Sequence, residues 1–194
     1  MSRRGDTLPV DYFDELYRQK PDPWDFQTSE YEREKYDATL ACLPRPRYER
    51  AFEAGCSIGV LTCRLADRVD ALMACDASAI PLQHAKDRCS TRANVSFLQA
   101  AIPSGWPDGR FDLMILSEVL YYLSAPDLAS CAERVSDSLN RGGDLVMVHY
   151  TGATDYPLSG DAAATMFGEM ISSFARQMES RQAVGYRLDV WRRT

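Results

Sequence analysis

The chain has 194 residues, of which 45% are hydrophobic and 26% charged, and its formal net charge is −6. This length suits a single domain with a substantial core. The acidic balance argues against nucleic acid as the main partner, because phosphate binding needs clustered Lys and Arg. No apolar stretch approaches the roughly 20 residues of a membrane span, and the first residues lack the apolar core of a signal peptide. We therefore expect a cytoplasmic protein that acts away from membranes, as a monomer or a homodimer.

The cysteines lack the C-x-x-C spacing that is typical of zinc and redox sites. Several of them lie in apolar runs, such as residues 72–75, where a thiol acts as a small hydrophobic side chain. We expect all of them to be reduced and buried, in keeping with a reducing compartment, and we expect no metal site. They are Cys42, Cys56, Cys63, Cys75, Cys89 and Cys131.

Residues 1–45 differ from the rest, because aromatic and charged side chains crowd there between prolines. We interpret this stretch as a lid of one or two helices that lies over the carboxyl-terminal edge of a sheet. Tyr12, Trp24 and Tyr31 can offer aromatic faces to a cationic ligand. The alternative is a packed N-terminal extension with no part in catalysis.

Residues 46–194 read as one globular unit, in which short apolar runs alternate with longer amphipathic stretches. This alternation favours an α/β fold of Rossmann-like type, with a mostly parallel central sheet, helices on both faces and right-handed crossovers. Strands are expected over residues 50–54, 71–75, 95–99, 111–116, 145–149 and 186–191. Helices are expected over residues 60–66, 80–89, 127–139 and 161–178, the third of them closed by Gly142 and Gly143.

The segment Glu53–Gly59 follows the first expected strand and opens the first helix of this unit. Gly55 permits a tight turn, and Gly59 permits close packing of helix on strand, which is the arrangement that receives an adenosyl or dinucleotide ligand. Asp76 ends the next strand, about twenty residues further on, where a carboxylate can accept hydrogen bonds from both ribose hydroxyls. An equally good interpretation of Asp76 alone is a helix N-cap.

Glu53 distinguishes between the two kinds of ligand. A carboxylate beside the glycine turn would place like charge next to the pyrophosphate of NAD. S-adenosylmethionine (SAM) carries no phosphate, and it has an ammonium and a sulfonium group instead. The sequence therefore favours SAM, with S-adenosylhomocysteine (SAH) as its product, over NAD.

Polar side chains follow the ends of two central strands, where ligands bind in such sheets. Ser117 and Glu118 come directly after the strand at 111–116, and His149 ends the strand at 145–149. We expect a methyl donor and an acceptor to meet here, with one of Tyr121 and Tyr122 in the core and the other lining the pocket. His149, Glu118 or the hydroxyl of Tyr121 is expected to act as the base, and Glu118 suits the orientation of a cationic amine.

With these motifs assembled, the chain resembles the class I SAM-dependent methyltransferases and, more narrowly, the nodulation protein S family. The resemblance runs over roughly residues 12–191, and it includes Asp22-Pro23-Trp24 and Tyr31-Glu32-Arg33-Glu34. It also includes Glu53-x-Gly55-Cys56-x-x-Gly59, Phe111-Asp112, the run from Ser117 to Leu123, and Gly142-Gly143.

The resemblance implies a seven-stranded sheet whose last strand is antiparallel. It also implies that Glu53, Gly55 and Gly59, with Cys56 between them, form the SAM loop and that Asp76 holds the ribose. Nodulation-type members methylate a free amine on a deacetylated chitin oligosaccharide, which suggests an amino sugar as the acceptor. Trp24 and Arg33 are expected to contact the cofactor as well, with Arg33 binding its carboxylate.

The sequence departs from the family pattern at two places near the cofactor. Ser57 stands where many class I enzymes have Gly, which narrows the loop. Ala101 stands where many relatives have an Asp that accepts a hydrogen bond from the adenine amino group, so a backbone contact from Ile102 is expected to remain. In addition, the short tail after the helix at 161–178 predicts that strand six is abbreviated or absent.

The acceptor stays open at this point. An N-methyltransferase acting on a small amine, such as an amino sugar or a related metabolite, is the first hypothesis. The alternatives are an O- or C-methyltransferase acting on another small metabolite, a non-catalytic SAM-binding or interaction protein, and an NAD-binding enzyme. A charged pocket lined by aromatic side chains would favour an amine or a sugar as the acceptor, whereas an apolar pocket would favour a phenol.

Overall fold

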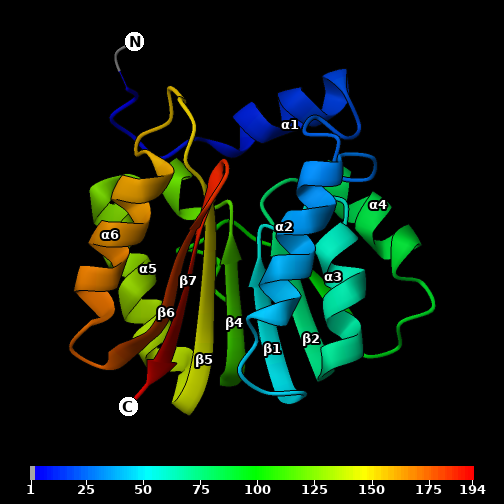
Figure 1. Cartoon of the computed structure of the whole chain (residues 1–194). Coiled ribbons are helices and arrows are strands. Elements are labelled where there is room, and N and C mark those ends of the chain that lie inside the picture. Colours follow the sequence, from blue (N-terminus) through cyan, green and yellow to red (C-terminus); the bar gives the residue numbers. More distant parts are fainter. Residues whose placement is uncertain (1–2) are drawn as a thin grey trace.

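A seven-stranded sheet forms the centre of the computed structural model, which describes residues 3–194 (Figure 1). The strand order is β3-β2-β1-β4-β5-β7-β6; β1 to β5 pair in parallel, and β7 runs antiparallel to both of its neighbours. The expected Rossmann-like fold and its antiparallel last strand are therefore confirmed. The strands are β1 (Tyr48–Ala54), β2 (Val69–Asp76), β3 (Val95–Gln99), β4 (Phe111–Ser117), β5 (Leu139–Tyr150), β6 (Ala175–Ala183) and β7 (Tyr186–Arg193).

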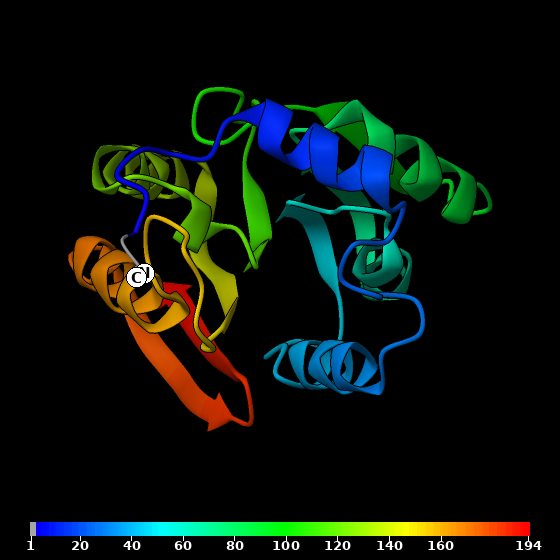
Figure 2. The same cartoon turned by 90° about the horizontal axis from the view of Figure 1, so that it is seen from above.

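Helices cover both faces of the sheet, as expected, and the view from above shows them on its two sides (Figure 2). Helices α5 and α6 pack on one face, and α2, α3 and α4 pack on the other. The helices are α1 (Val10–Gln19), α2 (Glu30–Ala41), α3 (Val60–Leu65), α4 (Ala79–Arg88), α5 (Ala125–Ser138) and α6 (Gly160–Ile171). Two short 3-10 turns, η1 (Ala66–Arg68) and η2 (Leu120–Tyr122), complete the chain.

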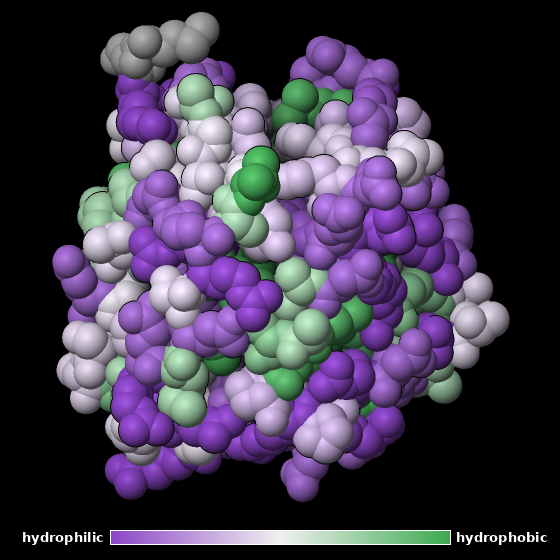
Figure 3. Space-filling view, in the orientation of Figure 1, coloured by the Kyte–Doolittle hydropathy of each residue, from purple (hydrophilic) through white to green (hydrophobic). Residues whose placement is uncertain are grey.

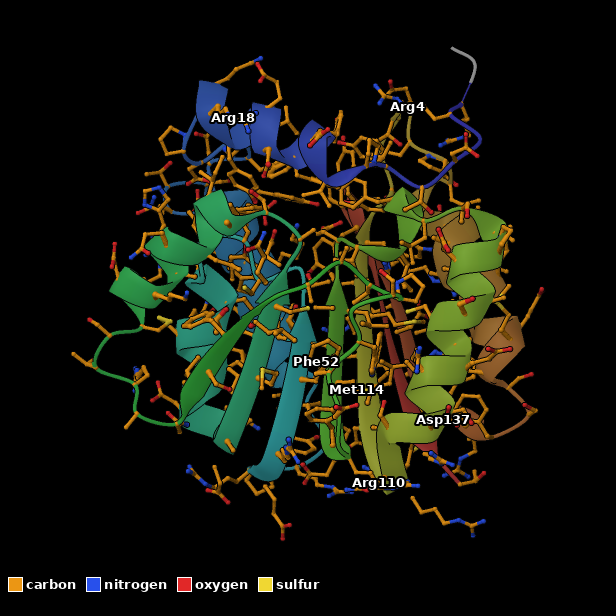
Figure 4. All side chains as sticks on the ribbon, turned by 180° about the vertical axis from the view of Figure 1, so that it is seen from behind. Arg4, Arg18, Phe52, Arg110, Met114 and Asp137 are labelled. Carbon is orange, nitrogen blue, oxygen red and sulfur yellow. A yellow bond between two sulfur atoms is a disulfide. The ribbon has the colours of Figure 1, made fainter. Side chains whose placement is uncertain are left out.

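Strand β4 shows why the sequence folds as two cores around one sheet. Successive side chains of a strand point to opposite faces. Met114 and Leu116 accordingly belong to the core under α5 and α6, and Leu113 and Ile115 belong to the core under α2 and α3. Figure 4 shows Met114 in the layer between the sheet and α5, whereas Arg110 lies at the edge of the sheet that is opposite α1. The wholly apolar run at 111–116 is thus a strand buried on both faces.

The C-terminal part differs from the expectation. The helix expected over 161–178 ends at Ile171, and the following residues form β6, so the prediction of an abbreviated or absent strand six is wrong. Strand β6 pairs with β7 alone at the edge of the sheet, and most of its side chains are exposed. Because neither face of such a strand is fully buried, its sequence lacks the alternating apolar pattern by which strands are recognised.

The turn expected at Gly142 and Gly143 also takes a different form. Helix α5 ends at Ser138, and both glycines lie inside β5, where the register with β4 shifts between Phe111 and Leu113. Gly142 adopts a φ of +74°, which only glycine reaches without cost. These glycines therefore mark an irregular start of the strand and do not close the helix.

The N-terminal segment divides into two parts with different positions. Helix α1 lies above the carboxyl ends of the central strands, as expected for the lid (Figures 1 and 2). Helix α2 instead runs along one face of the sheet, where Tyr36 joins the core beside Leu61 and Leu65 of α3. The expectation of helices over the sheet edge thus holds for α1 only. The first two residues of the segment 1–45 lie outside the described residues.

Two cysteines form a disulfide, which corrects the expectation that all six are reduced. Cys63 of α3 is bonded to Cys89, the residue that caps the end of α4. Gly59 and Ala85 lie one helical turn earlier in the same two segments, and they are in close contact. The close approach of the helices therefore brings the two thiols together. The cysteines no longer support the expectation of a reducing compartment. Cys42, Cys56, Cys75 and Cys131 are free and buried, as expected.

The surface is hydrophilic over most of the face that carries α2, β6 and β7, with small apolar patches between charged side chains (Figure 3). Within residues 3–194, no helix has both the length and the apolar character required to cross a membrane.

We expect Gly59→Ala to lower the free energy of unfolding by about 2–5 kcal/mol, from left-handed strain together with overpacking. Gly59 has a φ of +77°, and an added Cβ would lie 2.9 Å from Cα and Cβ of Ala85. Gly142→Ala is the matched control, because φ is +74° there but the nearest atom is the end of the Arg45 side chain at 3.9 Å. Urea unfolding should give a smaller loss for the control, and equal losses would contradict the packing role of Gly59.

Candidate active site

A cavity of about 500 Å³ lies at the carboxyl ends of the parallel strands, and residues of α1 line it. Its volume lies in the range of small-molecule sites. The order of strands reverses between β1 and β4, so the chain leaves these two strands in opposite directions, and a crevice forms between them. The cavity walls come from α1, the start of α2, and the loops that follow β1, β2, β3, β4 and β5.

The turn after β1 borders this cavity through Gly55. Its φ is +73°, and a Cβ on this residue would overlap the side chain of Val119 from the loop after β4. Its N–H donates to the carbonyl of Cys75 at 2.8 Å, which ties the turn to β2. The glycine expected at this turn is therefore required by both its conformation and its neighbours.

Two further members of the expected SAM loop do not border the cavity. Cys56 packs with Ala74 and Leu82 under α4. Gly59 is the N-cap of α3 and contacts α4. Gly59 therefore permits the close packing of two helices, whereas we expected it to permit the packing of a helix on a strand.

Ser57 takes up the left-handed conformation that glycine adopts without cost, with a φ of +51°. This conformation explains why glycine is common at this position in class I enzymes. The Ser57 hydroxyl lies 2.5 Å from the hydroxyl of Tyr17 on α1, and both residues line the cavity. Sequence reasoning did not identify Tyr17, because the contact joins segments that lie 40 residues apart.

Glu53 lies behind this turn and not at the cavity. Its side chain is in strand β1, the residue is only 2% exposed, and it does not line the cavity. Burial, with a smaller contribution from the charge of Asp76, raises the pKa of Glu53 to about 7. The argument that Glu53 would repel a bound pyrophosphate by direct contact is therefore not supported by its position.

Asp76 lies at the end of β2 and lines the cavity, as expected. One carboxylate oxygen accepts a hydrogen bond from the Ser57 N–H at 2.9 Å, and the other accepts one from the Ser78 N–H at 3.0 Å. Burial raises the pKa of Asp76 to about 6, against the effect of these donors. The N-cap of α4 is Ser78, whose hydroxyl accepts from the Ile80 N–H, so the alternative interpretation of Asp76 as the cap is wrong.

An apolar wall continues the cavity beside Asp76. Ala100, Ala101 and Ile102, which follow β3, line it, and Trp24 lines it as well. Ala101 and Ile102 therefore lie where an adenine contact was expected. No carboxylate stands in this part of the wall, in agreement with the departure seen in the sequence.

Glu118 is the centre of a hydrogen-bonded cluster at the β1–β4 crevice. Its backbone has a φ of +58°, which is uncommon for Glu. One carboxylate oxygen accepts from the Lys35 ammonium at 2.6 Å, and the other accepts from the Tyr121 hydroxyl at 2.7 Å and the Tyr150 N–H at 2.8 Å. These bonds hold the carboxylate in one orientation at the cavity, next to Ser117.

Lys35 and Glu32 complete this cluster. Sequence reasoning did not identify Lys35, and it identified Glu32 only as part of a family motif and not as a site residue. The Lys35 side chain is 2% exposed, and its ammonium donates to Glu32 at 2.9 Å. Burial alone would lower the pKa of Lys35, but Glu118 and Glu32 outweigh that effect and raise the pKa. Burial raises the pKa of Glu32, partly offset by the charge of Lys35. A helical spacing of three residues between two charges is common on exposed helix faces, so it gave no signal.

Arg33 does not reach the cavity, which contradicts its expected contact with the cofactor carboxylate. Its side chain is 63% exposed and pairs with Glu30 at 3.0 Å. The buried side of α2 carries Glu32, Lys35, Tyr36 and Thr39, which are spaced by three or four residues. Arg33 falls between these positions and therefore points to solvent.

His149 is also displaced from its expected role. The residue is fully buried, it does not line the cavity, and its Nε2 accepts a hydrogen bond from the Leu120 N–H at 3.3 Å. Burial lowers the pKa of His149 to about 4. Its ring lies behind that of Tyr121, with 5.5 Å between centroids, so it cannot take a proton directly from a molecule in the cavity.

Aromatic side chains form the remaining wall. Tyr121 belongs to the buried core and Tyr122 lines the cavity, as expected for one of each, but Tyr121 lines the cavity as well. Tyr156 from the loop after β5 stacks on Tyr121 at 5.3 Å, and Phe13 of α1 contacts Tyr122 edge-on at 4.9 Å. Trp24 and Tyr31 line the cavity as well, whereas Tyr12 does not.

This sheet order, with a glycine turn after β1 and an acidic residue at the end of β2, defines a Rossmann-like fold of the methyltransferase type. The Nodulation protein S (NodS) family model matches residues 14–152, and the chain belongs to that family. Nodulation protein S of Rhizobium tropici is 29% identical over 129 residues, which are 64% of this chain and 53% of that protein. Nodulation protein S of Bradyrhizobium diazoefficiens is 30% identical over 103 residues, which are 53% of this chain and 49% of that protein. The chain thus spans about half the length of these curated relatives.

Solved structures agree with this assignment. A protein from Pseudomonas syringae, described as a candidate methyltransferase, is 35% identical with a TM-score of 0.75, over 85% of this chain and 100% of that chain. N-methyltransferase NodS from Bradyrhizobium japonicum WM9, in complex with SAH, is 23% identical with a TM-score of 0.81, over 93% of this chain and 97% of that chain.

We expect Glu53→Gln to become more stable relative to the wild type as the pH rises. The pKa of Glu53 is about 7 in the folded chain, above the value near 4.5 from which it is shifted. The wild type therefore loses stability as the pH rises from about 4.5 through 7, by about 3 kcal/mol in total, and the amide does not. Urea unfolding at pH 5 and pH 8 should show a relative gain of about 2–3 kcal/mol for the variant.

Glu49→Gln is the control for this measurement, since it removes a solvent-exposed carboxylate from the same strand. An equal difference between Glu53→Gln and the wild type at both pH values would contradict the account of a buried, ionisable Glu53.

Proposed function

We propose that this protein is a SAM-dependent methyltransferase that acts on a small-molecule acceptor. The observation that carries the proposal is the position of Asp76 at the cavity, beside Gly55 and the apolar wall after β3. In this arrangement Asp76 would accept hydrogen bonds from the ribose hydroxyls, and Ala101 and Ile102 would flank the adenine ring. The fold shared with a NodS structure that holds SAH supports the same assignment.

The charges around the cavity support SAM over NAD. Among the described residues that line it, the charged side chains are Glu32, Asp76, Glu118 and Lys35, a formal surplus of two negative charges. Lys35, the only cation of the four, is already paired with two carboxylates. A pyrophosphate would thus meet repulsion here, whereas the positive sulfonium would be attracted. The preference for SAM thus comes from the side chains that face the cavity and not from Glu53, which does not line it.

Methyl transfer depends mainly on the alignment of the acceptor with the methyl group, and the protein need not supply a reactive group of its own. SAM, when bound, supplies a methyl group on a positively charged sulfur, which a nucleophilic atom can displace. Helix α1 and the aromatic wall would keep water from the cavity. Tyr121 and Tyr122 would orient the acceptor with their ring faces, and Glu118, itself held by three hydrogen bonds, would keep the Tyr121 hydroxyl in place.

We infer that the acceptor is an amine. The surplus of negative charge and the aromatic faces of Tyr121, Tyr122 and Tyr156 suit a cationic group. The structures and relatives named N-methyltransferase NodS or Nodulation protein S support the same class. Because His149 lies outside the cavity, we do not propose it as the base.

We expect Asp76→Ala to weaken SAH binding at least tenfold with the fold intact. Each charge-assisted hydrogen bond to the ribose is worth roughly 1.5–3 kcal/mol, and 1.4 kcal/mol corresponds to tenfold in affinity. Calorimetry with SAH is the measurement, and the wild type should give no heat with NAD. Asp70→Ala is the matched control, since Asp70 lies on the same strand but pairs with Arg47 at the surface. Unchanged SAH affinity in Asp76→Ala, or tight NAD binding by the wild type, would reject the proposal.

We also propose that the N-terminal segment, residues 1–45, acts as a lid over the cofactor site formed by residues 46–194. Two contacts connect α1 with the cofactor loops. The Tyr17 hydroxyl meets that of Ser57 in the glycine turn, and Asp14 accepts a hydrogen bond at 2.5 Å from the hydroxyl of Ser78, two residues after Asp76. A ligand that orders these loops would thereby stabilise α1.

Hydrogen exchange tests this lid. Amides of residues 10–40 should exchange more slowly when SAH is added, because closure protects their hydrogen bonds. The edge strand β6 lies away from the cavity and serves as the internal control. Equal exchange of residues 10–40 with and without SAH would make the segment a structural extension only.

A further inference from the structure

The residues that line the cavity are arranged in the same order as the strands from which they come. The apolar wall after β3 and Asp76 at the end of β2 are neighbours, and Gly55 after β1 and Ser117 at the end of β4 come next. If adenine lies by the wall and ribose by Asp76, as proposed above, the remaining part of the cofactor extends toward β1 and β4. That part is an α-amino acid group, which carries one ammonium and one carboxylate.

Both charges of an amino acid need partners at this place. Ligand carboxylates in proteins are held by Lys, Arg or backbone N–H groups. Arg33, which the sequence suggested, points to solvent, and among the described residues that line the cavity Lys35 alone is cationic. Lys35 reaches the crevice from the buried side of α2 and contacts Glu118, the residue that follows Ser117.

The ammonium of Lys35 can donate one more hydrogen bond. It carries three N–H donors, and carboxylates of Glu32 and Glu118 accept at 2.9 and 2.6 Å. These two carboxylates leave the cluster with one surplus negative charge. A cation on its own would match that surplus, and an added carboxylate on its own would not. A zwitterion satisfies both conditions, because its ammonium faces a carboxylate while its carboxylate faces Lys35.

We propose that Glu32, Lys35 and Glu118 form the subsite for the zwitterionic amino acid group of the cofactor, in which Lys35 binds the carboxylate and Glu118 faces the ammonium. This assignment rests on the proposed function and gives Lys35 the role that the sequence suggested for Arg33. Glu32 acts as a positioning residue, since it holds Lys35 from the side of α2. The surplus charge then also accounts for attraction of the cofactor, which is a cation overall.

Two ligands separate this subsite from the rest of the cavity. SAH carries the amino acid group, and 5′-methylthioadenosine has the same adenine and ribose but lacks it. In calorimetry Lys35→Met should weaken SAH binding by tenfold to a hundredfold, as expected for loss of a charge-assisted bond. Its affinity for 5′-methylthioadenosine should stay within about twofold of the wild type. Arg33→Met removes a cation from the exposed side of the same helix and should leave both affinities unchanged.

Removal of Lys35 leaves two buried carboxylates without a counter-ion, so the variant can lose stability. The double variant Glu32→Gln with Lys35→Met keeps the net charge of the cluster, and it should show the same selective loss of SAH binding. Equal weakening of both ligands would overturn the proposal, as would unchanged SAH affinity with a raised KM for the acceptor, which would assign the cluster to the acceptor. A wild-type protein that binds neither ligand would instead reject the proposed function itself.

Discussion

The close contact between Gly55 and Val119 fixes the geometry of the whole cavity. These residues belong to the turns after β1 and β4, the two strands between which the strand order reverses. A side chain on Gly55 would overlap Val119, so the two turns approach as closely as only glycine permits. One turn leads to Ser57 and Asp76, and the other leads to Glu118 and Tyr121. The two sides of the cavity are therefore held together where the Val119 side chain packs on the backbone of Gly55.

Burial and charge determine what this rigid crevice can bind. Three carboxylates and one ammonium face the cavity, and the carboxylates are held by backbone N–H groups, by Lys35 and by Tyr121. Buried charges need such partners, because desolvation is costly. The surplus negative charge gives the site a preference for positively charged ligands, which a sulfonium cofactor and an amine acceptor share. Helix α1 contacts the loops of the crevice through Tyr17 and Asp14, and as the proposed lid it would keep water away from these interactions.

Local sequence patterns were sufficient for the parts of the site that depend on the chain next to them. Gly55, Asp76 and Ser117 follow directly on buried strands, and the ends of parallel strands meet at one edge, so their position at the cavity was predictable. The wholly apolar run of β4 and the alternation of strands and helices likewise predicted the fold. Strand β6 was not predicted, because an exposed edge strand has no periodic pattern of apolar residues.

The remaining errors concern directions of side chains, which depend on contacts between distant segments. Lys35 and Arg33 are two residues apart on α2, and only the packing of that helix on the sheet decides which of them faces the cavity. His149 and Tyr150 are adjacent at the end of β5. The side chain of His149 is buried in the interior, whereas that of Tyr150 is exposed. The bond between Cys63 and Cys89 arises in the same way, from the approach of two helices.

A crystal structure of the protein grown with SAH would place each part of the ligand against named residues. We expect adenine beside Ala101 and Ile102, both ribose hydroxyls on Asp76, and the amino acid carboxylate at the Lys35 ammonium. Density for SAH outside this cavity, or in the reverse direction along it with adenine at Glu118, would show that the cavity is not the cofactor site proposed here.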